Sequence, residues 1–549
     1  MLAGIMKLSE LARAYDQISG ATSDPQKVRL LADLFRQADK NILESLAHFT
    51  LGEVVDPQIS DRLGIGPGAI REALAVISGK APDEIDDAIK QSGDLSDVVA
   101  AVRFNRADTL TVDGLWRQAN RTVKDNANRL EFIEHVFRHT TAVGAKYFTR
   151  MVLNQMRIGV GLGTLAKAMA EAFSVSASSV EHLYAMSNDI GLTARRARKG
   201  QSALEHSGLI LFKPYQFMNA QKVDDPAEIF KTLAGKPILF EVKYDGARLQ
   251  IHLKKNRPAE IKLYSRRLNE DTASLPDVVA ALRKAWKGDD AIIEGEVVAY
   301  DPLLKKKQPF QAVLMRLGRK HEIEEKAREI PLMLYLFDLL YYQGEDLMNL
   351  PQATRRKRLE TLFTPTERVQ MTAVVVSTRP VEQQRFFKQA IKAGHEGLMA
   401  KDPDAPYVPG KRTEHWMKLK PAFESLDVVV TGGIWGAGRR RNLLSSLIVA
   451  VRDKDAFKTV GKVGTGFSEE VLKDLTARLA PKIILGRGRN VELEPEMVIE
   501  VDFQDIQKTS RYAAGYVLRI PRFRRERTDK SLREADTLER LRRLYKQSH

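Results

Sequence analysis

The N-terminal part of the chain repeats apolar residues at the spacing of amphipathic helices. In residues 8–18 an apolar side chain recurs every three or four positions, which places these side chains on one face of a helix. Polar or small caps followed by an early proline or acid mark three further helix starts, at residues 23–25, 60–61 and 81–84. We therefore expect an all-α domain over residues 1–208.

From about residue 210 the pattern changes to the alternation that is typical of strands. Alternating or β-branched runs occupy residues 237–244, 248–253, 261–265 and 291–299. Helical spacing returns between and after them, at residues 278–286, 354–362 and 382–393. This mixture predicts an α+β domain over residues 209–423. The basic run at residues 195–200, which precedes it, fits either an exposed hinge or a solvated loop.

Beyond residue 424 the candidate strands become short and the basic residues dense. Strands are expected at residues 426–431, 447–451 and 498–503, with Gly-rich turns at residues 432–438 and 461–466. Five or so short strands in a segment of this length suit a small closed barrel, and an oligonucleotide-binding (OB) barrel has the right size. We expect an OB-fold over residues 424–549, and hence a three-domain protein.

The composition of the chain excludes several classes of site. The absence of cysteine removes disulfides, thiolate nucleophiles and zinc sites with Cys ligands. The ten histidines lack HExxH spacing, so we expect any metal to be a hard, oxygen-liganded ion such as Mg²⁺. The net charge of +16 favours an anionic partner, either nucleic acid or an acidic membrane surface. We recognise neither a signal peptide nor an apolar run of 18 residues, and expect a cytoplasmic protein.

Two Gly-rich runs resemble nucleotide-binding loops only in part. Residues 159–163 lack the GxGxxG spacing and follow no strand, so a loop that opens a helix is the better interpretation. Residues 433–440 end in GRR rather than GK[ST], and therefore lack the lysine and the hydroxyl of a P-loop. We expect a Gly-rich hairpin of the barrel there.

The most informative segment is residues 241–248, EVKYDGAR. A strand here points Glu241, Lys243 and Asp245 to one face, and the glycine that follows presents the lysine at a turn. The segment resembles KxDGxR, the nucleotide-attachment motif of the covalent nucleotidyltransferases, which include DNA ligases, RNA ligases and mRNA capping enzymes. Further motifs of this superfamily follow in order, at residues 265–266 (SR), 293–298 (IEGEVV), 335–339 (YLFDL), 396–401 (EGLMAK) and 416–420 (WMKLK).

Other stretches narrow the resemblance to ATP-dependent DNA ligases of the archaeal and eukaryotic type. Residues 519–530 contain five arginines between Arg519 and Arg527 and resemble motif VI of DNA ligases. Residues 411–412 (KR) precede WMKLK as they do in those enzymes, and residues 150–160 are similar to the DNA-binding domain that precedes their catalytic core. The chain departs from the pattern at Glu294, where many relatives have Asp, which leaves the role of this position open.

The resemblance implies a three-step reaction that uses ATP and Mg²⁺. Lys243 attacks the α-phosphorus of ATP and expels pyrophosphate, AMP passes to the 5′-phosphate of nicked duplex DNA, and the 3′-OH then displaces AMP. By the same resemblance, Glu241 reads the adenine amino group, Arg248 contacts the ribose and Phe337 stacks on the base. The implied nucleotide contacts are Glu241, Arg248, Arg266, Glu296, Phe337, Arg412, Lys418 and Lys420, and the implied Mg²⁺ ligands are Glu296 and Glu396. Motif VI contributes Arg519, Arg527, Asp529 and Lys530. The resemblance implies that this motif closes on the pyrophosphate by rotation about a hinge near residues 420–425.

The first step requires Lys243 to be neutral, whereas an unperturbed lysine titrates near ~10.4. Neighbouring cations and burial lower the pKa of a lysine, and carboxylates raise it. We therefore expect Lys418, Lys420 or a bound Mg²⁺ close to Lys243.

Two other classes of protein remain alternatives at this point. The helical N-terminal region and the RxDK ending of motif VI disfavour an RNA ligase or a capping guanylyltransferase. An NAD⁺-dependent ligase is disfavoured because this chain has no cysteines for the Cys₄ zinc module of those enzymes. A non-enzymatic DNA-binding scaffold is disfavoured by the intact motif residues.

A nick-sealing enzyme is expected to act as a monomer that grips phosphates regardless of base sequence. A sliding clamp remains a possible partner, since residues 383–387 (QQRFF) match a clamp-binding peptide poorly.

Overall fold

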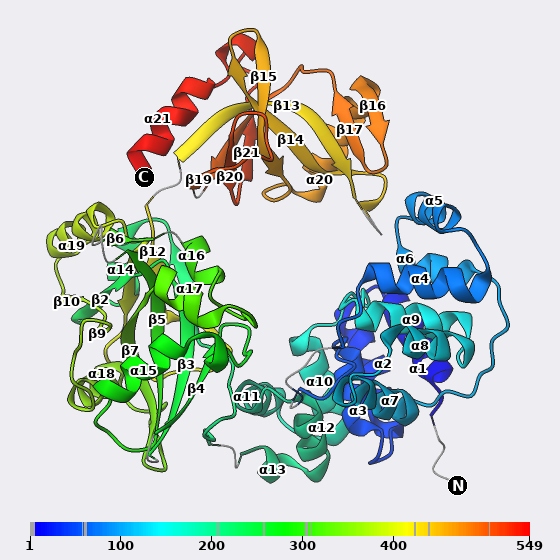
Figure 1. The fold of residues 1–549 in the computed structure, drawn as a ribbon, viewed down its shortest axis with the longest axis horizontal. Coiled ribbons are helices and arrows are strands. Elements are labelled where there is room, and N and C mark those ends of the chain that lie inside the picture. Colours follow the sequence, from blue (N-terminus) through cyan, green and yellow to red (C-terminus); the bar gives the residue numbers. More distant parts are fainter. Residues whose placement is uncertain are drawn as a thin grey trace. The chain divides into compact units, whose positions relative to one another are not determined.

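The computed structural model describes residues 6–548 apart from 58, 60–62, 206–207, 256–258, 302–305, 309, 422–423, 437–439 and 504. The chain divides into two compact units, Met1–Ala73 with Phe104–Pro421 and Leu74–Arg103 with Ala422–His549. Along the sequence a helical region is followed by a region of sheets and helices and then by a strand-rich region (Figure 1). Among the described residues, no helix is long and apolar enough to cross a membrane.

The N-terminal region is helical, as predicted. The apolar face expected in residues 8–18 is buried in α1. Ser23 and Ala81 are the N-caps of α2 and α5, and the loop at residues 159–163 opens α10 with Gly161 as its N-cap. The helix start expected at residues 60–61 lies outside the described residues. The helices are α1 Leu8–Gly20, α2 Asp24–Gln37, α3 Leu43–Thr50, α4 Pro67–Ser78, α5 Pro82–Ser92, α6 Leu95–Ala101, α7 Val112–Lys124, α8 Arg129–Arg138, α9 Ala142–Val152, α10 Leu162–Phe173, α11 Ala177–Ser187, α12 Ile190–Lys199 and α13 Gln201–Glu205.

The basic run at residues 195–200 is neither a hinge nor a loop, because all but its last residue belongs to α12. Asp189 caps this helix by accepting a hydrogen bond from Leu192 N at 2.8 Å. Ala194 and Ala197 are buried on its inner face, and cations in a last turn interact favourably with the negative end of the helix dipole. The small apolar residues at helical spacing therefore decide the structure, and the prediction from charge was wrong.

The central region contains two β-sheets with helices packed on them (Figure 1). One sheet has five strands in the order β1-β12-β11-β2-β10, and the other has the order β4-β3-β5-β7-β8, with β6 paired to β5 and β9 paired to β7. The strands are β1 Asn219–Val223, β2 Ile238–Lys243, β3 Ala247–Lys254, β4 Glu260–Ser265, β5 Ala291–Asp301, β6 Lys306–Lys307, β7 Leu332–Tyr342, β8 Glu345–Asp346, β9 Val369–Met371, β10 Val374–Ser377, β11 Gly397–Lys401 and β12 Arg412–Leu419. The helices are α14 Pro226–Thr232, α15 Pro276–Ala285, α16 Phe310–Leu314, α17 Ile323–Glu329, α18 Gln352–Thr361 and α19 Pro380–Lys392, with a 3₁₀ turn at Thr272–Ser274.

A shared apolar cluster joins the two central sheets. It takes Ile292 and Phe337 from the larger sheet and Trp416 from the smaller one, together with Tyr215 and Tyr407 from connecting segments. A second cluster lies on the larger sheet beneath α15, and a third supports the five-stranded sheet. Burial of these side chains is worth roughly 25 cal/mol per Å² of apolar surface, so the two sheets are held as one body. The predicted strands and helices of this region are confirmed to within a few residues.

The C-terminal region is built around one long strand, β13. Its first half pairs with β18, its second half pairs with β17, and its other edge pairs with β14. The elements are β13 Glu424–Trp435, β14 Leu444–Asp453, β15 Ala456–Val463, α20 Glu469–Leu479, β16 Ile483–Arg487, β17 Asn490–Leu493, β18 Val498–Phe503, β19 Asp505–Lys508, β20 Tyr516–Arg519, β21 Arg522–Glu526 and α21 Leu538–Ser548, with 3₁₀ turns at Ala480–Lys482 and Leu532–Glu534.

The curvature of β13 fits the expected OB-fold. A register shift lies between Val430 and Gly432, and a Cβ at Gly432 would lie 2.8 Å from the carbonyl oxygen of Val491. Two different partners on one edge require such a bend. The described residues contain more strands than the five or so expected, because β16, β17, β19 and β20 are too short to show alternation in the sequence. The Gly-rich run at residues 433–440 begins at the end of β13, and its residues 437–439 lie outside the described part.

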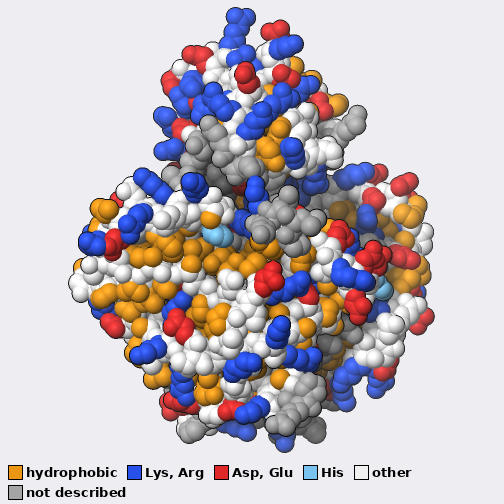
Figure 2. Space-filling model, turned by 60° about the vertical axis from the view of Figure 1, so that its left-hand side comes forward, with side chains coloured by type: hydrophobic (Ala, Val, Ile, Leu, Met, Phe, Trp, Pro, Cys, Tyr) orange, Lys and Arg blue, Asp and Glu red, His pale blue; other side chains and the backbone are white. Residues whose placement is uncertain are grey.

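Basic side chains are numerous on the face of the molecule shown in Figure 2. They are interspersed with acidic side chains and with bands of hydrophobic ones. On this face the excess positive charge is therefore distributed rather than gathered in one patch, and the cationic site described next is defined by specific contacts.

Candidate active site

Lys243 is the last residue of β2 and lies beside Glu396. Strand β2 pairs with β11, whose register sets Gly397 opposite Lys243, and the amide of Glu396 donates to the carbonyl oxygen of Lys243 at 3.0 Å. This pairing brings the carboxylate of Glu396 into an ion pair with the Lys243 ammonium. The Lys243 side chain keeps 23% of its surface exposed, so it remains accessible to a ligand.

Two glycines allow the neighbouring strands to approach Lys243. A Cβ at Gly246 would lie 2.2 Å from the carbonyl oxygen of Val297, and a Cβ at Gly397 would lie 2.1 Å from that of Leu419. Gly397 also has φ +143°, a conformation that other residues rarely adopt. The glycine of the KxDG segment is thus required by close packing against β5, and the glycine after Glu396 by close packing against β12.

Two lysines of the β12 segment complete the cationic side of the site. Lys420 Nζ lies 2.9 Å from Glu396 Oε1, so the Glu396 carboxylate bridges Lys243 and Lys420. Burial lowers the pKa of Lys418 and of Lys420, and the charge of Lys243 lowers both further. Although burial raises the pKa of Glu396, Lys243 and Lys420 hold it below its usual value. Both lysines that were expected near Lys243 therefore lie within its electrostatic reach.

Glu296 supplies a second carboxylate to the same cluster. It lies on β5 opposite Arg248 of β3. Burial raises the pKa of Glu296 to about 7; Lys243 and Arg248 oppose that rise, and Glu396 adds to it. A carboxyl with such a pKa gains or loses its proton near neutral pH.

Glu294, where the sequence departs from the motif, anchors Arg248. It is fully buried and accepts hydrogen bonds from Arg248 Nη2 at 2.5 Å, Tyr215 Oη at 2.8 Å and Tyr407 Oη at 2.7 Å. Arg248 also donates to the carbonyl oxygen of Met218 at 2.8 Å. The charge of Glu294 is thereby neutralised, and Arg248 is fixed at the inner wall of the site.

Glu241 and Phe337, the two residues expected at the adenine base, are both buried. The Glu241 carboxylate lies 2.8 Å from Arg356 Nη1 and 2.7 Å from Lys401 Nζ. Phe337 packs edge-on against Trp416, with ring centroids 6.2 Å apart, and the Lys401 ammonium lies 4.7 Å from the Phe337 centroid. These residues form one connected cluster of aromatic rings and charges.

Arg266 and Arg412 lie at the rim of the site and are exposed. Arg266 Nη2 donates to Asn219 Oδ1 at 3.1 Å, and both arginines lower the pKa of Lys418. The central region therefore gathers every cofactor-contact and metal-ligand residue that the sequence suggested. The residues of motif VI belong to the other compact unit.

Three family models match the chain. They are the DNA ligase N terminus over residues 7–170, the ATP dependent DNA ligase domain over residues 217–420 and the ATP dependent DNA ligase C terminal region over residues 440–530. The DNA ligase of Thermococcus fumicolans is 38% identical over 98% of this chain and 98% of its own length, and that of Methanopyrus kandleri is 36% identical over 99% of both. This chain belongs to the ATP-dependent DNA ligases.

The fold of this ligase is also shared with a solved structure named "Pmar-Lig_PreS3". That structure covers 94% of this chain and 99% of its own, with a TM-score of 0.60 and 18% sequence identity. The expected fold class is confirmed: a helical N-terminal region, a central α+β adenylation region and a C-terminal strand-rich region consistent with an OB-fold.

Motif VI of the ligase is held inside its own region by ion pairs. Arg527 Nη1 lies 2.8 Å from both carboxylate oxygens of Asp427, and Arg527 Nη2 lies 2.7 Å from Asp529. Lys530 Nζ lies 2.6 Å from Asp427. Asp529 and Asp427 together raise the pKa of Arg527. Arg519, at the end of β20, is partly exposed.

The sequence motifs missed several side chains that complete the adenylation site. Lys307 of β6 lies near the cluster, because burial lowers its pKa, Asp245 and Glu396 raise it, and Lys243 lowers it again. Arg356, from α18, and Lys401 neutralise Glu241. Lys401 ends the EGLMAK segment and was visible in the sequence. Lys307 and Arg356 carried no local signal, because their neighbours in the site come from other strands.

Proposed function

We propose that Lys243 is the residue through which this ATP-dependent DNA ligase carries AMP while it seals nicks in duplex DNA. The observation that supports this assignment is the position of the Lys243 ammonium, which is partly exposed, paired with Glu396 and surrounded by further cations. A cluster of buried, crowded lysines stabilises the charge that develops on a transferring phosphoryl group.

Lys243 must lose a proton before it attacks the α-phosphorus of ATP. Attack forms the Nζ–P bond and breaks the bond from phosphorus to the bridging oxygen, which leaves with pyrophosphate. Glu396 is a weak proton acceptor, because Lys243 and Lys420 hold its pKa low. When no metal is bound, Glu296 has a pKa of about 7 and is matched to accept a proton at neutral pH. The positive charges of Lys418 and Lys420 stabilise the charge that develops on the transferring phosphoryl group.

Glu296 and Glu396 fit the proposed Mg²⁺ site by their chemistry. Both offer carboxylate oxygens, the ligands that this hard cation prefers, and they lie close enough for each charge to disfavour the other. Bound there, Mg²⁺ would neutralise charge on the triphosphate and the two carboxylates.

The remaining side chains bind the nucleotide in this proposal. Lys418 and Lys420 contact the α-phosphate, Arg248 contacts the ribose and Phe337 stacks on adenine. Glu241 reads the adenine amino group, while Arg356 and Lys401 hold its carboxylate in place. Arg266 and Arg412 extend the cationic rim towards the phosphates. The supporting observations are that Lys418 and Lys420 lie within electrostatic reach of Lys243, and that Glu241, Lys401, Phe337 and Arg248 belong to one set of contacts.

Three domains serve these steps, with boundaries at residues 1–208, 209–423 and 424–549. Arg519, Arg527, Asp529 and Lys530 act on the pyrophosphate when the C-terminal domain turns about residues 420–425, of which 422–423 lie outside the described part. Nicked duplex DNA is held mainly through its phosphates, so affinity falls with added salt and varies little with base sequence. The enzyme acts in the cytoplasm as a monomer. Residues 383–387, which match a clamp-binding peptide poorly, lie in α19.

The test is to locate the adenylate. Incubation of the full chain with ATP and Mg²⁺, followed by peptide mass spectrometry, is expected to find one AMP on Lys243. Lys243→Ala is expected to carry none while it binds nicked duplex as the wild type does. Lys254→Ala, at an exposed lysine on β3, is the matched control and retains labelling. AMP on another side chain, labelling by GTP in place of ATP, or sealing of RNA but not DNA would refute the proposal.

A further inference from the structure

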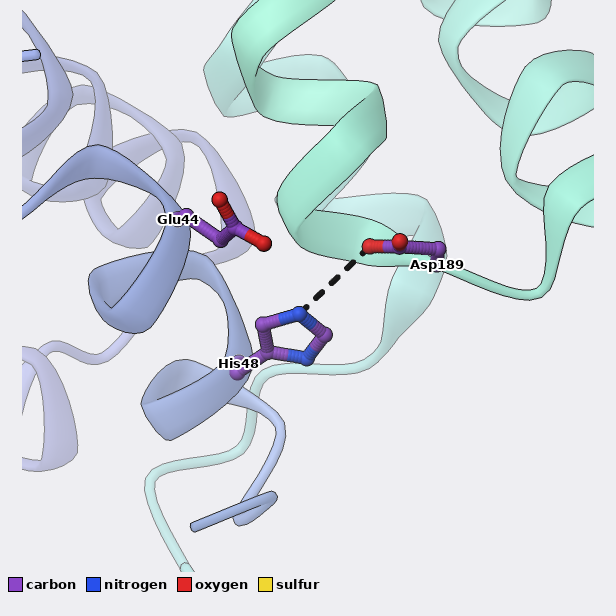
Figure 3. Close-up of side chains that lie close together, drawn as sticks. All are labelled: Glu44, His48 and Asp189. Carbon is purple, nitrogen blue, oxygen red and sulfur yellow. Dashed lines mark ion pairs between the residues drawn. The ribbon is translucent and has the colours of Figure 1, made fainter. Parts of the chain in front are cut away.

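Glu44, His48 and Asp189 form a second group of converging ligand atoms, in the helical region (Figure 3). Glu44 and His48 lie one turn apart on α3, and Asp189 is the N-cap of α12. One ligand atom from each residue lies within 4.8 Å of those of the other two. The His48 side chain is 1% exposed, so the group is closed from bulk water on the histidine side.

Although burial opposes the rise, Asp189 and Glu53 raise the pKa of His48 to about 9, so a metal ion at its outer ring nitrogen would replace a proton. Nδ1 lies 2.7 Å from Glu53 Oε2, and since a carboxylate accepts, Nδ1 is the donor. In the neutral ring Nε2 therefore carries a lone pair. This buried atom makes no hydrogen bond in the part of the chain that the structure describes, and it faces Asp189 Oδ1 at 3.5 Å. Opposed lone pairs in a buried site repel each other unless a cation lies between them.

The separation of these two atoms distinguishes a metal ion from a proton. A proton shared in a charge-assisted hydrogen bond draws nitrogen and oxygen to ~2.7–2.9 Å. Two ligands of one tetrahedral metal, each ~2.0–2.2 Å from it, lie about 3.4 Å apart. The observed 3.5 Å matches the second arrangement. A carboxylate behind the imidazole, here Glu53, is also the usual support of a metal-binding histidine.

The surrounding residues hold the three ligands without blocking them. A Cβ at Gly191 would lie 2.4 Å from Glu44 Cγ and 2.6 Å from His48 Nε2, so only glycine lets the first turn of α12 lie over the group. The ring of Trp116 stacks on that of His48, with centroids 5.0 Å apart and planes at 15°. Arg195 Nη1 lies 3.3 Å from Glu44 Oε2, which leaves Oε1 for a metal.

We propose that Glu44, His48 and Asp189 bind a divalent transition metal of the zinc class that ties α3 to α12. One imidazole and two carboxylates suit zinc, whereas Mg²⁺ prefers oxygen ligands throughout. A water molecule completes the tetrahedron. The site is structural and independent of Lys243. It therefore makes stability depend on a metal ion that is separate from the Mg²⁺ proposed for catalysis.

Zinc affinity of the full-length protein tests this proposal. Chelator-stripped wild type is expected to bind one Zn²⁺ tightly in competition with a chromogenic chelator. The near-isosteric variants Glu44→Gln and Asp189→Asn are expected to bind it at least ~10-fold more weakly, and Glu53→Gln roughly 10–100-fold more weakly. His135→Ala is the matched control, because the rings of His135, on α8, and His139, its C-cap, stack with centroids 4.1 Å apart and offer a competing pair of histidine ligands. This variant should bind Zn²⁺ as tightly as the wild type does.

A spectroscopic and a thermal measurement identify where the metal binds. Co²⁺ in the wild type is expected to give the visible absorption of a tetrahedral site, which Asp189→Asn loses. Zn²⁺ is expected to raise the melting temperature of the wild type but not of Asp189→Asn, once circular dichroism has shown that both metal-free proteins are folded. Equal zinc affinity in wild type, Glu44→Gln and Asp189→Asn, or a loss confined to His135→Ala, would overturn the proposal and identify His48 as an imidazolium held between Glu53 and Asp189.

Discussion

Two groups of basic side chains in this ligase are held in opposite electrostatic states. Around Lys243, the lysines at 418 and 420 are partly buried and crowded by one another, and their pKa values are lowered. In motif VI, Arg527 and Lys530 are already paired with Asp427, and Asp529 and Asp427 raise the pKa of Arg527.

This difference indicates which group can bind an anion without first breaking its own ion pairs. Crowded, partly buried cations gain stability when a phosphate enters, because the phosphate relieves their mutual repulsion. Around Lys243 a single carboxylate, that of Glu396, is shared by Lys243 and Lys420. Arg527 instead has both Asp427 and Asp529 as partners, so it gains less from a phosphate, which must first displace them. The central site is therefore organised to receive an anion, as the ATP site that we propose there requires, whereas the action that we propose for motif VI requires its ion pairs to break.

Lys420→Met should produce the largest effect on the central group. It removes a cation that contacts Glu396 and that we place at the α-phosphate, so the rate of self-adenylation is expected to fall by roughly 10²–10³-fold, the usual cost of one such electrostatic contact. Single-turnover labelling with radioactive ATP measures the rate, with Lys254→Met as control. A loss smaller than about threefold would show that crowding around Lys243 does not serve phosphate binding.

The carboxyl of Glu296 should make the stability of the central region depend on pH. Burial raises its folded-state pKa to about 7, above an unfolded value near ~4.3. Its contribution to stability is therefore fully present below pH ~4.3 and is lost as the pH rises through about 7. The loss is at most about 4 kcal/mol.

Glu296→Gln removes this dependence, so its melting temperature relative to the wild type is expected to increase between pH 5 and pH 8. Thermal unfolding in EDTA measures the difference, and Glu228→Gln, at an exposed site on α14, supplies the baseline. An identical difference at both pH values would mean that Glu296 is as readily ionised in the folded protein as in the unfolded chain.

The strands that carry the candidate site were largely predictable because their motifs are local. The EVKYDGAR segment encodes a strand and a close turn, and each later motif encodes one strand of the same two sheets. The side-chain contacts that hold those strands together could not be predicted from the sequence. Tyr215 and Tyr407 satisfy Glu294 from segments far apart in the chain, so the departure at position 294 had no explanation before the fold was known.

The other regions were less predictable, for two physical reasons. Several C-terminal strands span only four or five residues, which is too short to show an alternating pattern in the sequence. In α12, the run of basic residues drew attention away from the alanines that the helix buries. The Glu44–His48–Asp189 group shows only its helical half in sequence, since Asp189 joins it through tertiary packing. Expectations based on histidine spacing therefore pointed to oxygen-liganded metals alone.

Lys307 offers a smaller perturbation of the central group. Its charge lies near Lys243, Asp245 and Glu396, and burial lowers its pKa. Lys307→Met is expected to slow self-adenylation about tenfold near pH 7, because it removes a cation near the transferring phosphoryl group. The loss should shrink as the pH rises, since burial lowers the pKa of Lys307 and its charge is then lost in the wild type as well. Rate–pH profiles measure this, with the exposed neighbour variant Lys306→Met as control. A loss that is the same at every pH would assign Lys307 a purely structural role.

The smallest effect is expected where cations are already paired. Asp427→Asn removes the carboxylate that holds Arg527 and Lys530, so these side chains no longer have to leave an ion pair before they reach pyrophosphate. Self-adenylation is expected to quicken by about twofold to threefold, whereas Arg527→Ala should slow it by about tenfold or more, as loss of a charge-stabilising contact does. If Asp427→Asn slows the step as much as Arg527→Ala, the pairing positions Arg527 for catalysis and does not restrain it. The contrast between the two basic groups would then be one of location and not of readiness.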